Sequence, residues 1–312
     1  MEVLRGTGAR PAQRRPSVVT IGVFDGVHRG HVALFERVAM EAKADGVRAA
    51  IVTFEPHPVE VLAPERAPCV LTTIDQRLSL FEEHGFDLGV VLTFDRSLAS
   101  LTPADFVQAA LVDEVAARRV IVGEDFRFGH NRAGDITTLS ELGREFGFEA
   151  EAMHLVSDAG RRISSSDIRR LISEGDVSAA AALLGRGYRL AGSVVRGQAI
   201  ARELHGFPTI NLATHERACI PGFGVYAGWW VWRGRRLPGV VNVGRERGPG
   251  HDPAARAVVE IHIFDFDEDV GGKSGEIEFA AFLRPEMRFD RVDALAAQIR
   301  DDADRARQLL LS

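Results

Sequence analysis

Short runs of Val, Ile and Leu alternate with amphipathic stretches through the first half of the chain. The apolar runs predict strands at residues 18–24, 48–54, 88–94, 115–122 and 148–156. Helical spacing predicts helices at residues 32–44, 74–84 and 137–146, and a further one that opens at Thr102-Pro103, where an N-cap precedes a proline. Continuous apolar strands that alternate with helices are typical of a parallel sheet covered on both faces.

The second half has a different pattern. Two short helices are predicted at residues 164–174 and 177–184, followed by glycine-punctuated strands at 190–195, 224–232, 237–243, 257–264 and 275–282. The last segment, 292–311, has the pattern of a charged amphipathic helix. We therefore predict an α/β protein with a disordered lead over residues 1–16, a parallel-sheet domain over 17–185, and a small antiparallel β-barrel with a C-terminal helix over 186–312.

The composition is that of a globular protein that acts on small molecules. Of the residues, 46% are hydrophobic and 26% are charged, and the net charge of −6 argues against nucleic acid as the main partner. Cys69 and Cys219 lie far apart and suggest neither a zinc site nor a disulfide framework, which fits a reducing cytosol. No apolar run approaches a membrane span and the first 16 residues do not resemble a secretory signal, so we expect a cytoplasmic location.

One strand, turn and helix start carry the first candidate site, in the sequence GVFDGVHRGH from Gly22 to His31. Free backbone N–H groups and the helix dipole make such a turn a binding site for anions. His28 and His31 are three residues apart, so their side chains would share one face of the first helical turn. This geometry suits the phosphates of a nucleoside triphosphate. Asp25 either contributes to that site or simply caps the turn.

Three further motifs follow this turn in order: TFEPHP at residues 53–58, GEDFRFG at 123–129 and ISSSDIR at 163–169. Together the four motifs resemble the nucleotidyltransferase domain of bacterial bifunctional riboflavin kinase/FAD synthetases. The resemblance implies a Rossmann-like domain that transfers AMP from ATP to FMN, giving FAD and pyrophosphate, with Mg²⁺ neutralising the departing pyrophosphate.

The same resemblance implies roles for individual residues of this first domain. The expected catalytic residues are His28, His31 and Arg169, the last of which would hold the β- and γ-phosphates. The expected nucleotide-binding residues are Gly22, Phe24, Asp25, Gly30, Ser164, Ser165 and Ser166, and the expected flavin-binding residues are His57, Pro58, Asp125 and Arg127. The serines could equally be a helix N-cap cluster and Arg169 part of a solvated helix face. Asp167 departs from the family motif by adding a negative charge near a phosphate site.

The second half resembles the riboflavin kinase module of the same family. The matching segments are GFPTINL at residues 206–212, GVYA at 224–227, VEIHIFDF at 259–266 and LRPEMRF at 283–289. The resemblance implies that Thr209 and Asn211 hold Mg²⁺ with ATP, that Glu260 is the catalytic base, and that Arg284 lies near the flavin. Oxygen ligands such as a hydroxyl and an amide carbonyl suit Mg²⁺.

Three departures leave the activity of this kinase module open. The glycine-rich loop at residues 197–206 has Ala201 where the family has glycine, and one residue more than the family loop. The segment from 242 to 249 lacks the Thr and Phe of the family motif, and Gly271-Gly272 replaces a tyrosine–glycine turn, with an insertion at Ser274-Gly275. On these grounds Glu260 could instead be an ordinary strand residue that faces solvent or pairs with an arginine.

Two alternatives to the leading hypothesis follow. In the first, the chain is a related nucleotidyltransferase that acts on another phosphorylated acceptor or another nucleotide, and its second domain is a non-catalytic binding module. In the second, the barrel senses a flavin or nucleotide, or is purely structural. The leading hypothesis names ATP, FMN and riboflavin as small-molecule ligands, expects no nucleic acid or membrane partner, and leaves the oligomeric state open.

Overall fold

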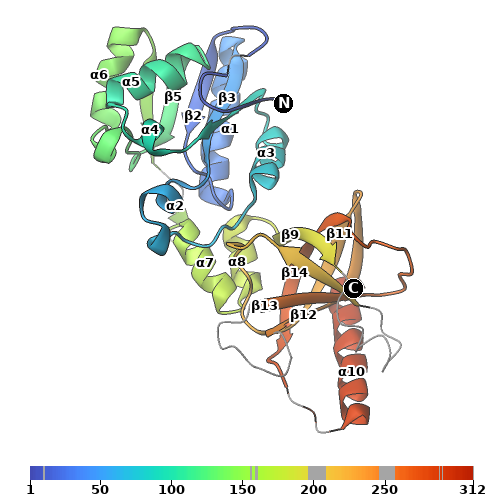
Figure 1. Cartoon of the computed structure of the whole chain (residues 1–312). Helices are drawn as coiled ribbons and strands as arrows, with labels where there is room; N and C mark the ends of the chain where they lie inside the picture. The colour runs from blue at the N-terminus through green and yellow to red at the C-terminus, as the bar shows by residue number, and fades with distance from the viewer. Residues whose placement is uncertain are drawn as a thin grey trace. The chain divides into compact units, whose positions relative to one another are not determined.

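The chain folds into two compact units. The computed structural model describes residues 1–9, 11–154, 157–158, 161–195, 209–245, 257–287, 289 and 291–311. The first unit consists of Met1–Pro68 and Thr73–Ser164, and the second of Cys69–Thr72 and Ser165–Ser312 (Figure 1). The chain therefore passes from one unit to the other at three places, after Pro68, Thr72 and Ser164.

A six-stranded parallel sheet forms the centre of the first unit. Its strands, in the order β1-β4-β3-β2-β5-β6, all pair in parallel. They are β1 Glu2–Arg5, β2 Ser17–Ile21, β3 Arg48–Glu55, β4 Leu88–Thr93, β5 Ala117–Gly123 and β6 Glu149–Met153. The helices are α1 Arg29–Asp45, α2 Pro58–Leu62, α3 Ile74–Glu83, α4 Arg96–Ala99, α5 Pro103–Phe106, the π-helix Val107–Asp113 and α6 Ile136–Phe146. The predicted parallel sheet with helices is confirmed.

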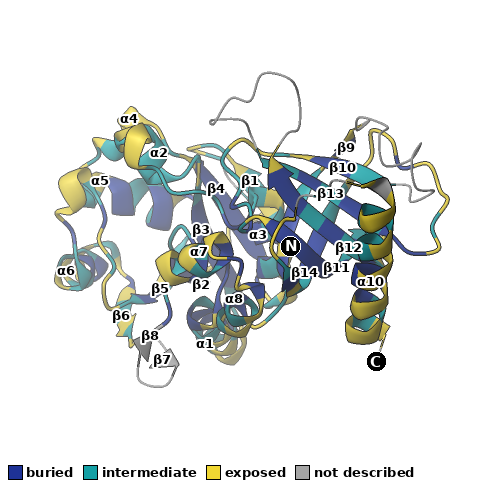
Figure 2. Cartoon of the chain, turned by 90° about the horizontal axis from the view of Figure 1, so that it is seen from below, coloured by how far each residue is buried: buried dark blue, intermediate teal, exposed yellow. Residues whose placement is uncertain are grey.

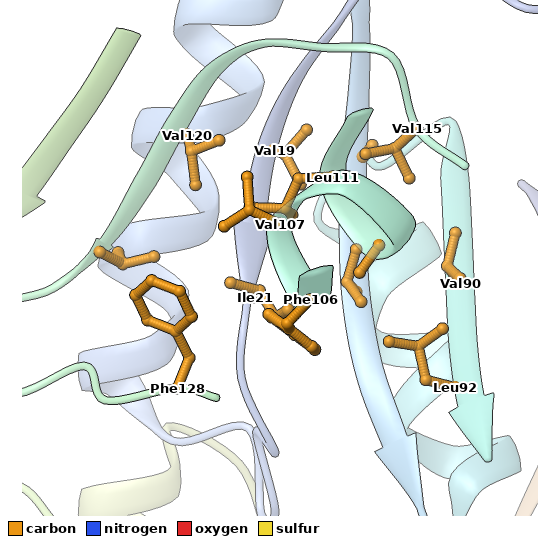
Figure 3. Packing of buried hydrophobic residues seen from close by; sticks show 14 of the residues in the cluster. Val19, Ile21, Val90, Leu92, Phe106, Val107, Leu111, Val115, Val120 and Phe128 are labelled. Carbon is orange, nitrogen blue, oxygen red and sulfur yellow. The ribbon is translucent and has the colours of Figure 1, made fainter. Parts of the chain in front are cut away.

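Strand alternation separates two hydrophobic cores on the two faces of this sheet. Val18, Ile51 and Ile121 belong to the core that includes side chains of α1 and α3. The neighbouring Val19 and Val120 belong to the other core, which contains side chains of the π-helix and α6 and is shown in Figure 3. Strands buried on both faces read as continuous apolar runs, which is why the sequence predicted them well.

The first residues of the chain are ordered, contrary to the expected disordered lead. Glu2–Arg5 forms β1, which pairs in parallel with β4 at the edge of the sheet. Farther along, the backbone N–H of Gly8 donates to Oε1 of Glu114 across 2.6 Å, and the Glu114 side chain is buried. The lead is thus held by backbone pairing and by a buried carboxyl group, neither of which has a signature in a sequence rich in Arg, Pro and Gly.

The Glu114 carboxyl makes the stability of the first unit depend on pH. Burial raises the pKa of Glu114 from its usual 4.5 to about 7, the hydrogen bond from Gly8 opposes the shift, and Asp113 adds to it. Since the folded state holds this proton more tightly than the unfolded state, the stabilisation is complete below pH 4.5 and is lost as the pH rises towards 7.

Glu114→Gln should remove this dependence. Because the glutamine cannot ionise, we expect the free energy of unfolding of the variant to gain about 1–2 kcal/mol relative to the parent between pH 5 and pH 8, after allowance for partial solvation. Urea unfolding at the two pH values measures the difference. Parallel pH dependences of the two proteins would contradict it.

The second unit is built on a closed antiparallel barrel. The strand order is β10-β13-β12-β11-β14-β9, and a β9–β10 pair closes it. The strands are β9 Tyr188–Val195, β10 Thr209–Thr214, β11 Gly224–Trp232, β12 Arg235–Arg245, β13 Ala257–Ile263 and β14 Ser274–Arg284. The long helix α10, Val292–Leu311, packs its apolar side on the outside of the barrel, while its other side is exposed (Figure 2). The predicted barrel with a C-terminal helix is confirmed.

The helices α7 and α8 belong to this second unit, although the sequence placed them in the first domain, which was expected to end at residue 185. They span Ser165–Ser173 and Val177–Leu184. The hydroxyl of Ser178 on α8 donates to the carbonyl of Ala280 on β14, and the N–H of Gly222 donates to the carbonyl of Ile172 on α7. The sequence pattern changes from helices to strands near residue 185, but α7 and α8 pack against the barrel. The compact units therefore divide at Ser164/Ser165.

The expected insertion at Ser274-Gly275 is part of a regular strand. These residues begin β14 and pair with Ser193 and Gly192 of β9. A Cβ on Gly275 would lie 2.3 Å from the indole ring of Trp230, which is fully buried in the barrel. The glycine thus makes room for a tryptophan at the start of this strand.

A disulfide bond joins Cys69 to Cys219, so the expectation that these cysteines form no disulfide framework is wrong. Their Cα atoms are 5.0 Å apart, and both residues belong to the second unit. Beside the bond, Val70 N–H donates to the Arg217 carbonyl and Cys219 N–H donates to the Val70 carbonyl, at 2.7 and 3.0 Å. The sequence separation of 150 residues concealed the pair, because only the fold brings the two segments together.

Removal of this disulfide should destabilise the second unit. We expect Cys69→Ser combined with Cys219→Ser to lower its free energy of unfolding by about 2–4 kcal/mol, because the bond closes a long loop in the unfolded chain. Urea unfolding with and without dithiothreitol provides the measurement. The reductant should bring the parent to the level of the double variant and leave the variant unchanged; a parent that is insensitive to the reductant while its thiols become free would contradict this account.

Candidate active sites

The first candidate site lies where β2 ends and α1 begins. His28 is the N-cap of α1, and its Nδ1 accepts a hydrogen bond of 3.3 Å from the backbone N–H of His31. The two imidazole rings are stacked with centroids 3.6 Å apart and planes 19° from parallel. In the neutral ring of His28 the proton is therefore on Nε2, which can donate to a phosphate oxygen. The predicted common face of the two histidines is present.

The turn before this helix has strained backbone. Phe24 and Val27 adopt left-handed conformations with φ of 52° and 42°. A bulky or β-branched residue with positive φ is rare and costs about 1–3 kcal/mol, and such residues concentrate at functional sites. The strain supports a functional role for this turn.

Gly22, Phe24 and Asp25 have distinct places in the turn. The Phe24 side chain is buried beneath it and packs edge-on against Phe35 and His31, so only its backbone is left to contact a nucleotide. A Cβ on Gly22 would lie 2.9 Å from that ring, which explains the glycine. Asp25 is buried, and its charge interacts with the guanidinium of Arg77. Gly30 is buried in the first turn of α1.

The expected flavin-binding residues of the first unit follow two other strands of the sheet. His57 caps α2, with its Nδ1 accepting from the Val59 N–H, and Pro58 is the first residue of that helix. Asp125 and Arg127 are exposed in the segment after β5, and Arg127 donates to the Phe126 carbonyl. Since β2, β3 and β5 are adjacent parallel strands, these residues and the two histidines all come from the carboxyl edge of the sheet. Their binding roles stay predictions.

The serine motif spans the boundary between the units. Ser164 is the last residue of the first unit, whereas Ser165, Ser166 and Arg169 belong to α7 of the second. The Nε of Arg169 donates to the carbonyl of Cys69 across 2.7 Å. Asp167 is exposed in the first turn of α7, where a negative charge stabilises a helix. The joint action of these residues with the histidines stays a prediction.

The second candidate site is a polar row on the outside of the barrel. Val259 and Ile261 of β13 are buried in the interior, so Glu260 between them faces outward. Asn211 of β10 lies directly opposite Glu260 on one side, and Asn242 of β12 lies opposite it on the other. Residues paired in this way have Cβ atoms about 4.5–5.5 Å apart. The row therefore places a carboxylate between two amides.

Metal binding at this row would depend on neutral oxygen ligands. Thr209 lies on the same face of β10 as Asn211, two residues away. Within the described part of the chain, no group of three or more His, Cys, Asp or Glu residues could hold a metal ion. A hydroxyl and an amide oxygen fit Mg²⁺ that arrives with nucleotide phosphates, because this ion usually keeps several ligands from substrate and water.

Arg284 is held by the C-terminal helix. Its guanidinium donates to both carboxylate oxygens of the buried Asp302 on α10, at 2.7–3.0 Å, and to the carbonyl of Pro285. Gln298 donates to the same carboxylate across 3.0 Å. These contacts fix the end of β14 against α10, and the expected role of Arg284 towards the flavin stays a prediction.

Comparisons with known proteins cover both units. The FAD synthetase family model matches residues 10–167, and the riboflavin kinase family model matches residues 184–310. A bifunctional riboflavin kinase/FMN adenylyltransferase from Pseudomonas fluorescens is 38% identical over 309 residues, which are 99% of this chain and 98% of that protein. The chain belongs to the bifunctional riboflavin kinase/FMN adenylyltransferase family.

Other members and a solved structure agree with this assignment. The bifunctional riboflavin kinase/FMN adenylyltransferase of Escherichia coli K12 is 35% identical over 99% of this chain and 97% of its own length. A crystal structure described as a macrolide-efflux protein from Streptococcus pneumoniae has a TM-score of 0.86 with 27% identity, and covers 98% of this chain and 99% of that one. In the described residues, no helix combines the length and the apolar character needed to span a bilayer.

Two residues of the chain were missed as site candidates. Asn242 carried a usable signal, because it is a polar residue between the buried Val241 and Val243 of a strand. Arg77 carried none, since one arginine on an amphipathic helix is most often solvated. The altered glycine-rich loop at 197–206, with Ala201, and residues 246–249 of the other altered segment lie outside the described residues.

Proposed function

We propose that this chain synthesises flavin nucleotides: the first unit transfers AMP from ATP to FMN, and the barrel phosphorylates riboflavin. The observation that carries the proposal is the stacked His28–His31 pair at the start of α1, next to a strained turn. It occurs in a chain whose two halves match the FAD synthetase and riboflavin kinase families.

In the first unit, the phosphate oxygen of FMN attacks the α-phosphorus of ATP, and the bond from that phosphorus to the bridging oxygen breaks as pyrophosphate leaves. Such a displacement needs positioning and charge stabilisation more than covalent help. Nε2–H of His28 donates to an α-phosphate oxygen, and the first N–H groups of α1 add donors along the helix dipole. The serine motif and Arg169 are the residues that we propose to bind the β- and γ-phosphates.

In the barrel, the carboxylate of Glu260 takes the proton of the ribityl 5′-hydroxyl while the oxygen of that hydroxyl attacks the γ-phosphorus of ATP, releasing ADP. The amides of Asn211 and Asn242 hold the carboxylate and the reacting hydroxyl in place. Thr209 and Asn211 are the residues that would hold Mg²⁺, which neutralises phosphate charge when it is bound.

We also propose a cytoplasmic location. The Cys69–Cys219 disulfide is the observation that argues against this location, because disulfides are rare in cytosolic proteins.

Two product assays on one preparation test the proposal. The purified chain is incubated with ATP, Mg²⁺ and either riboflavin or FMN, and FMN, FAD and pyrophosphate are quantified by chromatography. FAD and pyrophosphate in equal amounts are expected from FMN, and FMN together with the FAD made from it is expected from riboflavin. A folded protein that makes no FAD from FMN would refute the first activity, and one that makes neither FMN nor FAD from riboflavin would refute the second.

A further inference from the structure

Arg77 is a buried arginine at the carboxyl edge of the parallel sheet. It contacts the turn from Gly22 to Val27, which we call the phosphate turn. It is the fourth residue of α3, and its side chain is 4% exposed. Thr73 and Gln76 form a capping box at the start of this helix, which fixes the orientation of its first turn. The start of the helix thus fixes the direction in which the Arg77 side chain leaves the backbone.

The guanidinium of Arg77 connects the turn after β2 with the end of β3. Its Nη1 donates to the carbonyl of Val23 at 2.9 Å, and to Thr53 Oγ1 and the carbonyl of Phe54 at 3.2 Å each. Its Nη2 donates to Oε2 of Glu55 across 2.5 Å. The Thr53 hydroxyl also donates to the Val23 carbonyl, at 3.1 Å. The turn after β2 and the end of β3 are therefore joined through one side chain.

Burial of this side chain is costly for a residue with only a structural role. Burial lowers the pKa of Arg77, which the carboxylates of Glu55 and Asp25 counteract. Among the described residues, Nε of Arg77 is a buried nitrogen without a hydrogen-bond acceptor. A buried charge with an unsatisfied donor is a poor source of stability compared with an apolar side chain of similar volume.

The contacts of Arg77 meet the strained part of the phosphate turn. Val23, whose carbonyl accepts from Arg77, directly precedes Phe24, the first residue of this turn with positive φ. Strained conformations persist only where the surroundings over-determine them. The hydrogen bond from Arg77 is such a constraint.

Arg77 also faces the negative charges beside the turn. Asp25 is buried within the turn itself, where an uncompensated carboxylate would repel the phosphates of a nucleotide. The positive charge of Arg77 interacts with Asp25 and with Glu55. This charge offsets the repulsion between the Asp25 carboxylate and the nucleotide phosphates, while Arg77 itself stays buried and leaves the binding surface free.

We propose that Arg77 is a positioning residue for the nucleotide of the first unit: it holds the turn from Gly22 to Val27 in its strained shape and neutralises Asp25, so that the turn accepts a triphosphate. The inference rests on the proposed adenylyl transfer and adds a residue that touches no substrate. Removal of Arg77 then weakens ATP binding at this turn and displaces His28 from the reacting phosphate.

The test compares the parent with Arg77→Met, which keeps the volume and removes the charge and all the hydrogen bonds. Hydrogen–deuterium exchange of the peptide covering residues 22–35, with and without ATP and Mg²⁺, reports on this turn and the start of α1. We expect ATP to protect the peptide in the parent and not in the variant. In FAD formation we expect kcat/KM for ATP to fall about 10–100-fold, mainly through KM, while FMN formation from riboflavin stays at the parental rate.

Arg48→Met is the matched control. Arg48 begins β3 at the opposite edge of the sheet, its side chain is 11% exposed, and it donates to Glu2 and to the Arg15 carbonyl. We expect Arg48→Met to lower the free energy of unfolding, as Arg77→Met does. In this control, ATP should protect the peptide 22–35 as in the parent, and the kinetics of FAD formation should be unchanged. The proposal is overturned if ATP fails to protect the turn in the parent, or if Arg77→Met keeps the protection and kcat/KM of Arg48→Met.

Arg77→Lys decides the matter if the methionine variant does not fold. A lysine keeps the charge but cannot reach Val23, Phe54 and Glu55 together, so we expect partial ATP protection and an intermediate KM. Parental protection and kinetics in this variant would overturn the proposal. A parent that forms no FAD would refute the proposed function, while the exchange experiment would still test the role of Arg77 at the turn.

Discussion

We expect His28→Asn to lower the rate of FAD formation from FMN by about 10²–10³-fold, the usual cost of removing one donor to developing charge in a transition state. The Oδ1 of asparagine takes the place of Nδ1 and can accept from the His31 N–H, so the cap of α1 survives. What disappears is the donor at Nε2. The variant therefore separates the chemical role of His28 from its structural role, and steady-state kinetics with FMN and ATP measure the former.

His28→Ala is the companion variant, because it removes the cap as well as the donor. It should lose the same activity and, in addition, about 1 kcal/mol of stability. FMN formation from riboflavin, measured on the same samples, serves as the internal control and should not change. An asparagine variant with the parental rate of FAD formation would show that His28 only caps the helix.

The second large effect concerns Glu260. We expect Glu260→Gln to lower the rate of FMN formation about 10²–10⁴-fold, because a glutamine keeps the size and the hydrogen-bonding reach of the side chain but cannot take a proton. The site faces outward between Asn211 and Asn242, so the substitution leaves the barrel interior intact. FAD formation from FMN should stay at the parental rate.

Glu276→Gln supplies a matched control on the same barrel. Glu276 lies on β14, where it pairs with Arg189 and is not a neighbour of the polar row. Its substitution should leave both activities unchanged. If Glu260→Gln phosphorylates riboflavin as fast as Glu276→Gln, Glu260 is an ordinary strand residue, and the alternative left open by the sequence is correct.

Most of the secondary structure could be predicted because it follows from local pattern. The inner strands of the parallel sheet are buried on both faces, and the helix that opens at Thr102-Pro103 has the expected cap and proline. The short edge strand Glu2–Arg5 escaped because it is half-exposed and polar. Strand β10 was not predicted at all, although the motif within it was recognised.

The site residues divide in the same way. His28, His31 and Glu260 could be found because each belongs to a contiguous motif whose local geometry is fixed by one turn or one strand. Arg77 and the partner of Cys69 could not, since their contacts join segments that are distant in sequence. Long-range contacts of this kind have no period and no spacing that a single sequence displays.

The three passages of the chain between its units bear on how such an enzyme can be rearranged. A cut at one peptide bond cannot yield two self-sufficient halves, because Cys69–Thr72 belongs to the unit that otherwise begins at Ser165. A fragment that starts at residue 186 would lack Cys69 and the helices on its barrel, and a fragment that ends there would carry α7 and α8 without their support. A fragment that keeps the barrel together with its disulfide and both helices must therefore include Cys69–Thr72 as well as Ser165–Ser312, two stretches that are not contiguous in the sequence.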